Sequence, residues 1–225
     1  MASTFTIVWD EDTKRLYETG IDRGVLYPTK TTTANATTSY TGGVAWNGLT
    51  GVDENPSGAD ANDIYADNIL YLTLRGAEKF EYSIKAYTYP DEFAECDGTA
   101  AASTTGLYVT QQTRKPFGLT YRTLIGNDTE FNDHGYKIHL VYNSTANPSS
   151  KSYSTVNDSP EAIEFSWDCS TIPVAMTNFK PSAHLIVDST KADSTKLAAL
   201  EALLYGDGTA GGVLPTPDQV VATLT

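Results

Sequence analysis

Apolar and polar residues alternate with a period of two through most of this sequence. The pattern is clearest in residues 80–86, 117–123, 136–142 and 163–169, with shorter runs at 4–10, 25–27, 68–74, 106–111 and 183–188. Clusters of Gly, Asn, Asp and Pro separate the runs, and no run alternates with a long helix. The sequence therefore predicts a mainly β fold: an antiparallel β-sandwich or partial barrel in a single domain spanning residues 1–225.

Two short helices are expected to interrupt the strands. Residues 90–96 place proline and acidic residues in a first helical turn, with a glycine just beyond the end. A second helix is expected over 194–206, with Asp193 or Ser194 as its N-cap and Gly206 as its stop. Its apolar stripe consists of Leu197, Leu200 and Leu204. Each helix would cover a face or an end of a sheet.

Two segments lack a regular pattern. Residues 29–62 are small, polar and flexible around one apolar island that contains Trp46, which predicts a long loop with an exposed tryptophan. Such a loop either orders on a partner or is a disordered insertion whose tryptophan packs back on its own domain. Residues 207–225, spaced by Pro215 and Pro217, are expected to form an extended C-terminal arm.

The charge balance restricts the partners. A net charge of −13 arises from 28 acidic and 15 basic residues, and residues 31–74 and 152–179 contain no Lys or Arg. Nucleic-acid binding needs a basic surface, so this composition argues against it, although solubility alone is a simpler explanation. The first ten residues lack the features of a signal peptide, and no window is apolar enough for a membrane helix. We therefore expect synthesis in the cytoplasm and no membrane association.

The sequence offers little for catalysis or metal binding. His134, His139 and His184 are scattered, and none is spaced to share a metal with another or to activate a nucleophile. Cys96 and Cys169 are too few and too far apart for a disulfide framework or a zinc site, and Cys169 is expected to be a buried thiol. The glycine pairs lack the spacing of a phosphate-binding loop. We therefore expect no enzyme activity and no cofactor.

Carboxylates are the remaining candidates for a site. A glycoside hydrolase needs two that converge, and the candidates are Glu92, Glu95, Glu164 and Asp168. Glu164 and Asp168 lie four residues apart on the polar side of one strand, so an acidic surface explains them more simply. The acidic residues between 53 and 67 could attract calcium, but they lack the spacing of an EF-hand loop.

Several stretches together resemble the major tail protein, or tail tube protein, of long, flexible-tailed bacteriophages of Gram-positive hosts. They are residues 46–50, 54–59, 64–68, 86–93, 111–119, 135–142, 157–161 and 214–220. The set extends from about residue 44 to the C-terminus. No single motif is diagnostic, but the ordered set is specific. Thr216 and Gln219 depart from the expected pattern, which has a leucine and a glutamate there.

This resemblance implies a structural virion protein that forms hexameric rings stacked into a tail tube. Residues 29–62 would reach the adjacent ring, mobile before assembly and ordered after it, and 207–225 would be a second strap. The residues expected at subunit contacts are Trp46, Leu49, Leu204, Tyr205, Leu214 and Pro215. Other virion partners would be the tape-measure, tail-terminator and baseplate proteins.

The resemblance also gives the acidic composition a role. DNA would pass through the tube without specific binding, because an acidic wall repels it, and Glu164 and Asp168 are candidate acidic surface residues. Two other functions remain open from the residues alone. One is a β-sandwich carbohydrate-binding or adhesion module, for which an exposed Trp46 and the many tyrosines would form a sugar platform. The other is a glycoside hydrolase.

Overall fold

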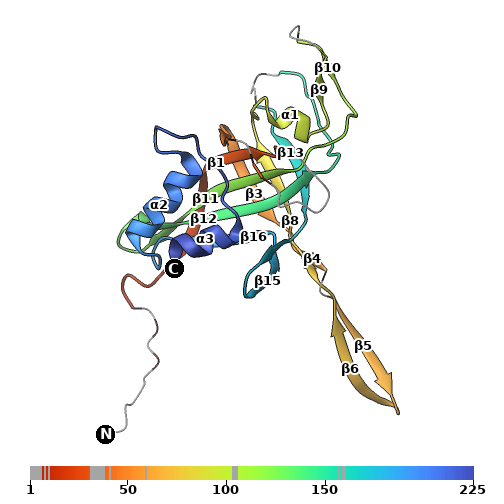
Figure 1. The fold of residues 1–225 in the computed structure, drawn as a ribbon, viewed down its shortest axis with the longest axis vertical. Helices are drawn as coiled ribbons and strands as arrows, with labels where there is room; N and C mark the ends of the chain where they lie inside the picture. Colours follow the sequence, from red (N-terminus) through yellow and green to blue (C-terminus); the bar gives the residue numbers. More distant parts are fainter. Residues whose placement is uncertain are drawn as a thin grey trace.

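Antiparallel strands dominate the computed structural model, which describes residues 7, 9, 11–30, 39–40, 42–58, 60–102, 106–156, 158 and 161–225. The main sheet has eight strands in the order β2-β1-β11-β12-β13-β8-β3, with β16 pairing β12 beside this path. Their bounds are β1 Tyr17–Pro28, β2 Val44–Ala45, β3 Leu49–Glu54, β8 Glu81–Ala86, β11 Phe117–Asn127, β12 Phe131–Ala146, β13 Phe165–Thr171 and β16 His184–Asp188. The predicted mainly β, antiparallel fold is confirmed (Figure 1).

The main sheet closes on itself through the short link between β2 and β3. β2 pairs with β1 at one end of the strand order, and β3 pairs with β8 at the other. The link is tied on both sides, because the Trp46 amide donates to the Gly24 carbonyl and the Tyr87 amide donates to the Gly48 carbonyl, both at 2.8 Å. The result is a small barrel, which leaves few strand edges unpaired.

One core fills this barrel, and the predicted alternation supplies it. Tyr82, Ile84 and Ala86 of β8 point inward with side chains of β11 and β13, as the period of two requires. Trp46 is also inside: it is only 3% exposed, its ring lies 4.6 Å from that of Phe93, and its indole nitrogen donates to the Thr88 carbonyl at 3.0 Å. The prediction of an exposed tryptophan is wrong, and the alternative in which the tryptophan packs back on its own domain is the one the structure supports.

The prediction of a long loop over residues 29–62 is also wrong. Within 29–62 the structure forms β2, β3 and β4 (Ser57–Gly58) and begins β5 (Ala61–Ala66), while residues 31–38, 41 and 59 lie outside the described part. The sequence of β3 favours a loop because Gly51, Asp53 and Glu54 are residue types that are uncommon in strands. β3 nevertheless forms a strand, because closure of the barrel pairs it with β8 and this pairing satisfies its backbone hydrogen-bonding groups.

A second core lies on the opposite face of the sheet, beneath helices α2 (Ser194–Tyr205) and α3 (Pro217–Leu224) (Figure 1). The predicted α2 is confirmed: Asp193 caps its first turn by accepting from the amides of Thr195 and Lys196. The predicted stripe is buried, and it consists of Leu197, Leu200 and Leu204. None of the described helices has the length and apolar character needed to cross a membrane.

The expected extended arm at 207–225 is wrong over its second half, which forms α3. Thr216 is the N-cap, Pro217 begins the helix, and the side chains of Thr216 and Gln219 form a reciprocal capping box. The hydrogen bonds of Thr216 and Gln219 stabilise the first turn of α3.

The smaller elements lie at the two ends of the barrel. α1 (Phe93–Cys96) confirms the second half of the helix predicted at 90–96 and seals one end with Phe93. The short strands are β4, β7 (Glu78–Lys79), β9 (Ala100–Ala101), β10 (Tyr108–Val109), β14 (Val174–Met176) and β15 (Phe179–Ser182). β5 and β6 (Ile69–Arg75) form a separate two-stranded hairpin, here called the hairpin arm, which projects far from the barrel (Figure 1).

Candidate functional site

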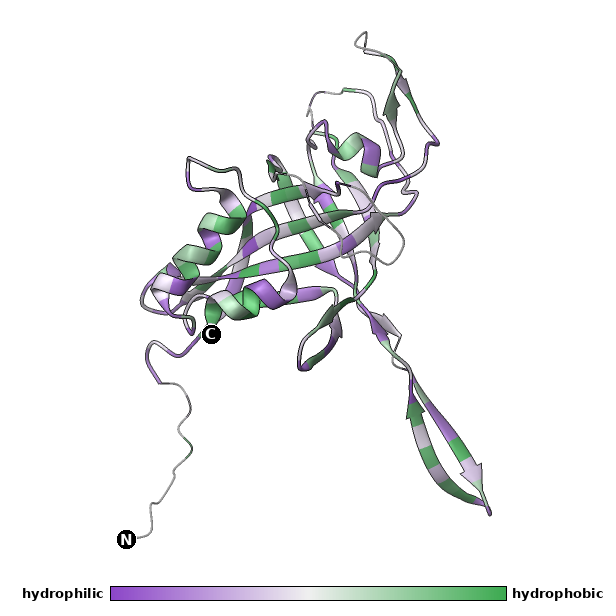
Figure 2. Ribbon diagram, in the orientation of Figure 1, coloured by the Kyte–Doolittle hydropathy of each residue, from purple (hydrophilic) through white to green (hydrophobic). Residues whose placement is uncertain are grey.

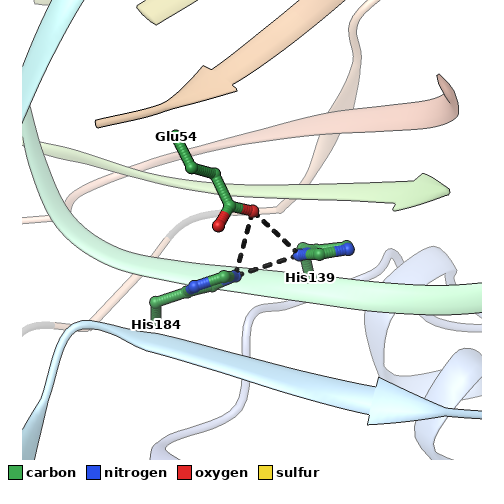
Figure 3. A group of neighbouring side chains, drawn as sticks. All are labelled: Glu54, His139 and His184. Carbon is green, nitrogen blue, oxygen red and sulfur yellow. Dashed lines mark hydrogen bonds and ion pairs between the residues drawn. The ribbon is translucent and has the colours of Figure 1, made fainter. Parts of the chain in front are cut away.

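Three potential metal ligands meet where the main sheet branches. β12 pairs with β16 over its middle and with β13 near its end, and Glu54, His139 and His184 gather beside this branch (Figure 3). His139 Nδ1 lies 3.1 Å from His184 Nε2 and 3.3 Å from Glu54 Oε1, and His184 Nε2 lies 4.0 Å from that oxygen. Among the His, Cys, Asp and Glu side chains that the structure describes, these three lie close enough together to share one metal ion.

Strand register brings the two histidines together. His139 is opposite Tyr121 of β11, and His184 is opposite Val141 of β12, so both imidazoles lie on the barrel side of β12. The expectation that no two histidines are placed to share a metal is wrong, because spacing along the chain does not report neighbours across an antiparallel ladder. His134 stands apart, with its Nδ1 2.6 Å from Glu130 Oε2.

Neighbouring side chains fix the orientation of the cluster. The Tyr121 hydroxyl donates to Glu54 Oε1 at 2.7 Å, and the Tyr121 ring stacks on His139 with centroids 4.5 Å apart. Thr123 Oγ1 lies 3.2 Å from His139 Nε2, the nitrogen that points away from the cluster. The ring of Phe80 stacks on His184 at 4.3 Å. Each ligand is therefore held by a second contact that restricts its rotation.

Burial sets the protonation of this cluster. It lowers the pKa of His139, and it lowers the pKa of His184 to about 4 even though Glu54 acts in the opposite direction. Burial, together with the hydrogen bond to Glu54, raises the pKa of the Tyr121 hydroxyl well above its usual value. At neutral pH both imidazoles are therefore uncharged, and together with the Glu54 side-chain oxygen they form a nitrogen- and oxygen-donor set suited to transition metals.

The carboxylates considered for glycoside hydrolysis have other partners. Glu95 pairs with Lys115 at 2.5 Å, Glu164 accepts from Thr50 at 2.5 Å, and Asp168 accepts from Ser83 at 2.6 Å. Glu92, at the start of α1, is exposed. Glu164 and Asp168 are exposed as well, consistent with an acidic surface, but their place in any channel stays a prediction.

The acidic run at 53–67 is divided between two structures. Asp53 forms an ion pair with Lys85 at 2.7 Å on the barrel, and Asp63 accepts from Thr73 at 2.5 Å on the hairpin arm. Glu54 turns to the histidines instead. A calcium loop needs its oxygen ligands around one point, and this arrangement spreads them over separate elements.

The residues predicted at subunit contacts lie mostly inside this chain. Trp46, Leu204, Leu214 and Pro215 are buried, and Leu49 and Tyr205 are partly buried against the two cores. Their packing within one chain accounts for their apolar character. As contacts between subunits they stay a prediction.

Sequence reasoning assigned the hairpin arm to a loop and a strand, and it missed the surface they form together. Seven large apolar side chains of the arm are between 37% and 68% exposed: Ile64, Tyr65, Ile69, Leu70, Tyr71, Leu72 and Leu74. Figure 2 shows apolar residues along both strands. The sequence signal that could have indicated this surface is the unbroken apolar run at 69–72, which leaves the strand without a polar face.

Comparisons with known proteins do not identify a family for this chain. No family model matches the sequence, and no curated protein matches it. Among solved structures, the chain is similar to the tube-terminating cap of the anti-feeding prophage, with 10% identity and a TM-score of 0.38 over 84% of this chain and all of the other. A likeness at this TM-score carries no argument about function.

Proposed function

We propose that this protein is a structural subunit of a phage tail tube, without enzyme activity, that assembles with copies of itself into stacked hexameric rings. The observation that carries the assembly is the hairpin arm. Its residues pair with each other in a two-stranded sheet, away from the two cores. The phage identity rests on the sequence resemblance, which also implies tape-measure, tail-terminator and baseplate proteins as neighbours in the virion.

The hairpin arm has the chemistry of a segment that is covered by a partner. An isolated two-stranded hairpin is at best marginally stable in water, and contiguous exposed apolar surface marks an interaction site. The turn is well formed: Asp67 and Asn68 have φ of 51° and 60°, as a tight two-residue hairpin turn requires. The turn therefore fixes the register of the arm, and a partner would supply the burial it lacks.

Both faces of the arm are apolar. Leu70, Leu72 and Leu74 share one face of β6, and Ile69 and Tyr71 lie on the other, as alternation along a strand requires. A strand that is apolar on both faces is typical of one buried on both sides. We infer that the arm inserts between two neighbouring subunits. Such a head-to-tail contact, repeated between rings, grows an open filament.

The acidic surface supports the conduit part of the proposal. The net charge of −13 would keep DNA from binding the wall, and Glu164 and Asp168 are exposed contributors to that charge. Replacing several lumen-facing residues with lysine should slow genome ejection while tubes remain intact. Normal ejection in such mutants would argue against an electrostatic role.

Electron microscopy of the purified protein over a range of concentrations tests the assembly. We expect rings or filaments from the natural chain and single particles from the double variant Leu70→Ser, Leu72→Ser, whose folding is spared because the arm lies outside both cores. The matched control is Ile172→Ser, since Ile172 is 67% exposed in the link between β13 and β14. Natural protein that stays monomeric at every concentration, even with its virion partners, would show the proposal to be wrong.

The carbohydrate-binding alternative lost its main support when Trp46 proved to be buried. The sequence features that favoured it were an exposed Trp46 and the many tyrosines, and of these only tyrosines are exposed. Trp46 instead packs in the barrel core and donates its indole hydrogen to Thr88. The burial of Trp46 therefore favours the proposed tail-tube function over carbohydrate binding.

A further inference from the structure

We propose that Glu54, His139 and His184 bind one divalent transition-metal ion, with Zn²⁺ as the best match, and that this ion fastens β3, β12 and β16 together. The inference concerns the interior of one chain. It does not depend on assembly into rings.

The spacing of the three ligand atoms fits a tetrahedral ion. Zinc binds imidazole nitrogen and carboxylate oxygen at about 2.0–2.1 Å, so two ligands of a tetrahedral site lie about 3.3 Å apart. Two of the observed separations are 3.1 Å and 3.3 Å, and the third, between His184 Nε2 and Glu54 Oε1, is 4.0 Å. Glu54 is the most exposed of the three, so a small movement of its side chain closes this last gap.

The surroundings resemble those of a metal site. Ligating histidines usually engage their second ring nitrogen, and ligating carboxylates are themselves hydrogen-bonded. Here Thr123 lies against the far nitrogen of His139, and Tyr121 donates to the Glu54 oxygen. Stacking on Tyr121 and Phe80 holds the two imidazoles. This arrangement lowers the conformational cost of gathering the ligands.

The donor set selects the type of metal. Calcium and magnesium prefer six or more oxygen ligands, whereas two imidazoles with one carboxylate suit zinc and its neighbours. Three protein ligands leave a fourth position for water. The Glu54 side chain is 37% exposed, so the cluster is open to solvent on that side, and a pocket of about 250 Å³ lined by Phe80, Pro181 and His184 among others reaches one of the two histidines.

The ligands come from distant parts of the chain, so the ion would act as a crosslink. β16 joins the sheet by pairing with β12, and nothing in that pairing ties it to β3. A shared ion would connect the start of β16 to the end of β3 across the branch. Because the unfolded chain holds no such preformed site, binding would add to the stability of the fold.

Calorimetric titration of the metal-free full chain with ZnCl2, alongside thermal unfolding with and without ZnCl2, tests the proposal. We expect one ion per chain and a higher Tm with zinc. His184→Asn and Glu54→Gln should each weaken binding at least tenfold. Glu54→Gln removes the charge of a partly exposed side chain, so it remains informative if His184→Asn does not fold.

His134→Asn is the matched control, because His134 also contacts a carboxylate but has no second imidazole beside it in the described structure. It should bind zinc as the natural chain does. The arm variant Leu70→Ser, Leu72→Ser should also bind zinc, which separates a failure of this site from a failure of assembly. Absence of stoichiometric binding at micromolar zinc, or equal binding by all variants, would overturn the proposal.

Discussion

The hydroxyl of Tyr27, in strand β1, donates a hydrogen bond of 2.8 Å to the carbonyl oxygen of Leu204, in the last turn of α2. The two residues are 177 positions apart and both are fully buried. Carbonyls in the last turn of a helix have no partner within that helix, so this bond satisfies one of them inside the core. It connects the helical layer to the sheet.

Removing this bond should destabilise the protein. Tyr27→Phe keeps the ring but leaves the Leu204 carbonyl without its donor, which typically costs about 1–3 kcal/mol. Chemical denaturation with urea would measure the change in the free energy of unfolding. Tyr71→Phe, on the exposed hairpin arm, is the control and should change it by less than about 0.5 kcal/mol. Equal effects would show that the bond adds nothing.

The same carbonyl explains why the chain needs a glycine at position 212. A Cβ at Gly212 would overlap the Leu204 carbonyl oxygen, whereas a Cβ at Gly211 meets nothing within 4 Å. Gly212→Ala should therefore cost about 1–3 kcal/mol or more through steric strain, and Gly211→Ala should be nearly neutral. Thermal unfolding of the two variants side by side provides the measurement. A neutral Gly212→Ala would mean that the loop yields freely.

Stability should fall as the pH is lowered through the range in which His184 titrates. Burial, with a smaller contribution from His139, holds the pKa of His184 at about 4, below its usual value of 6.5, while Glu54 opposes the shift. Between these values the unfolded chain takes up a proton that the folded chain does not, so the free energy of unfolding decreases toward acid. His139 contributes in the same direction.

The loss should reach up to about 3 kcal/mol between pH 6.5 and pH 4, and above pH 6.5 this group should have no effect. Urea denaturation of the metal-free protein at a series of pH values would measure it. In His184→Asn this part of the slope should disappear, and in His134→Asn it should persist. An unchanged slope in His184→Asn would place the acid sensitivity elsewhere.

The sequence predicted those parts of the fold that local patterns specify. The alternation in β8, β11 and β13 identified the barrel-facing residues, because each strand is half buried by a neighbouring layer. Asp193 and the leucine stripe predicted α2, because a cap residue and a helical repeat of apolar residues are both visible in the local sequence. The start of α3 is also visible in the sequence, since Thr216, Pro217 and Gln219 form a standard helix start signal, but the same prolines are equally typical of an extended arm.

Such local patterns could not predict the candidate site. Glu54, His139 and His184 are brought together by the pairing of β3 with β8 and of β16 with β12, and neither pairing leaves a mark in the local sequence. The burial of Trp46 depends on the same long-range closure of the barrel. Charge and composition around residue 50 favour a loop, and tertiary pairing overrides that preference.

The two cysteines provide a probe of global unfolding. Cys96 and Cys169 are both buried in the barrel core, and burial raises the pKa of Cys96 to about 12 and that of Cys169 still further. Because the thiolate is the reactive form, neither should react with a maleimide in the native protein at pH 7, and both should react in urea. An Ile172→Cys variant supplies an exposed thiol that should react at once. Mass spectrometry counts the labels, and rapid labelling of Cys96 or Cys169 in the folded chain would mean that the barrel opens locally rather than unfolding as one unit.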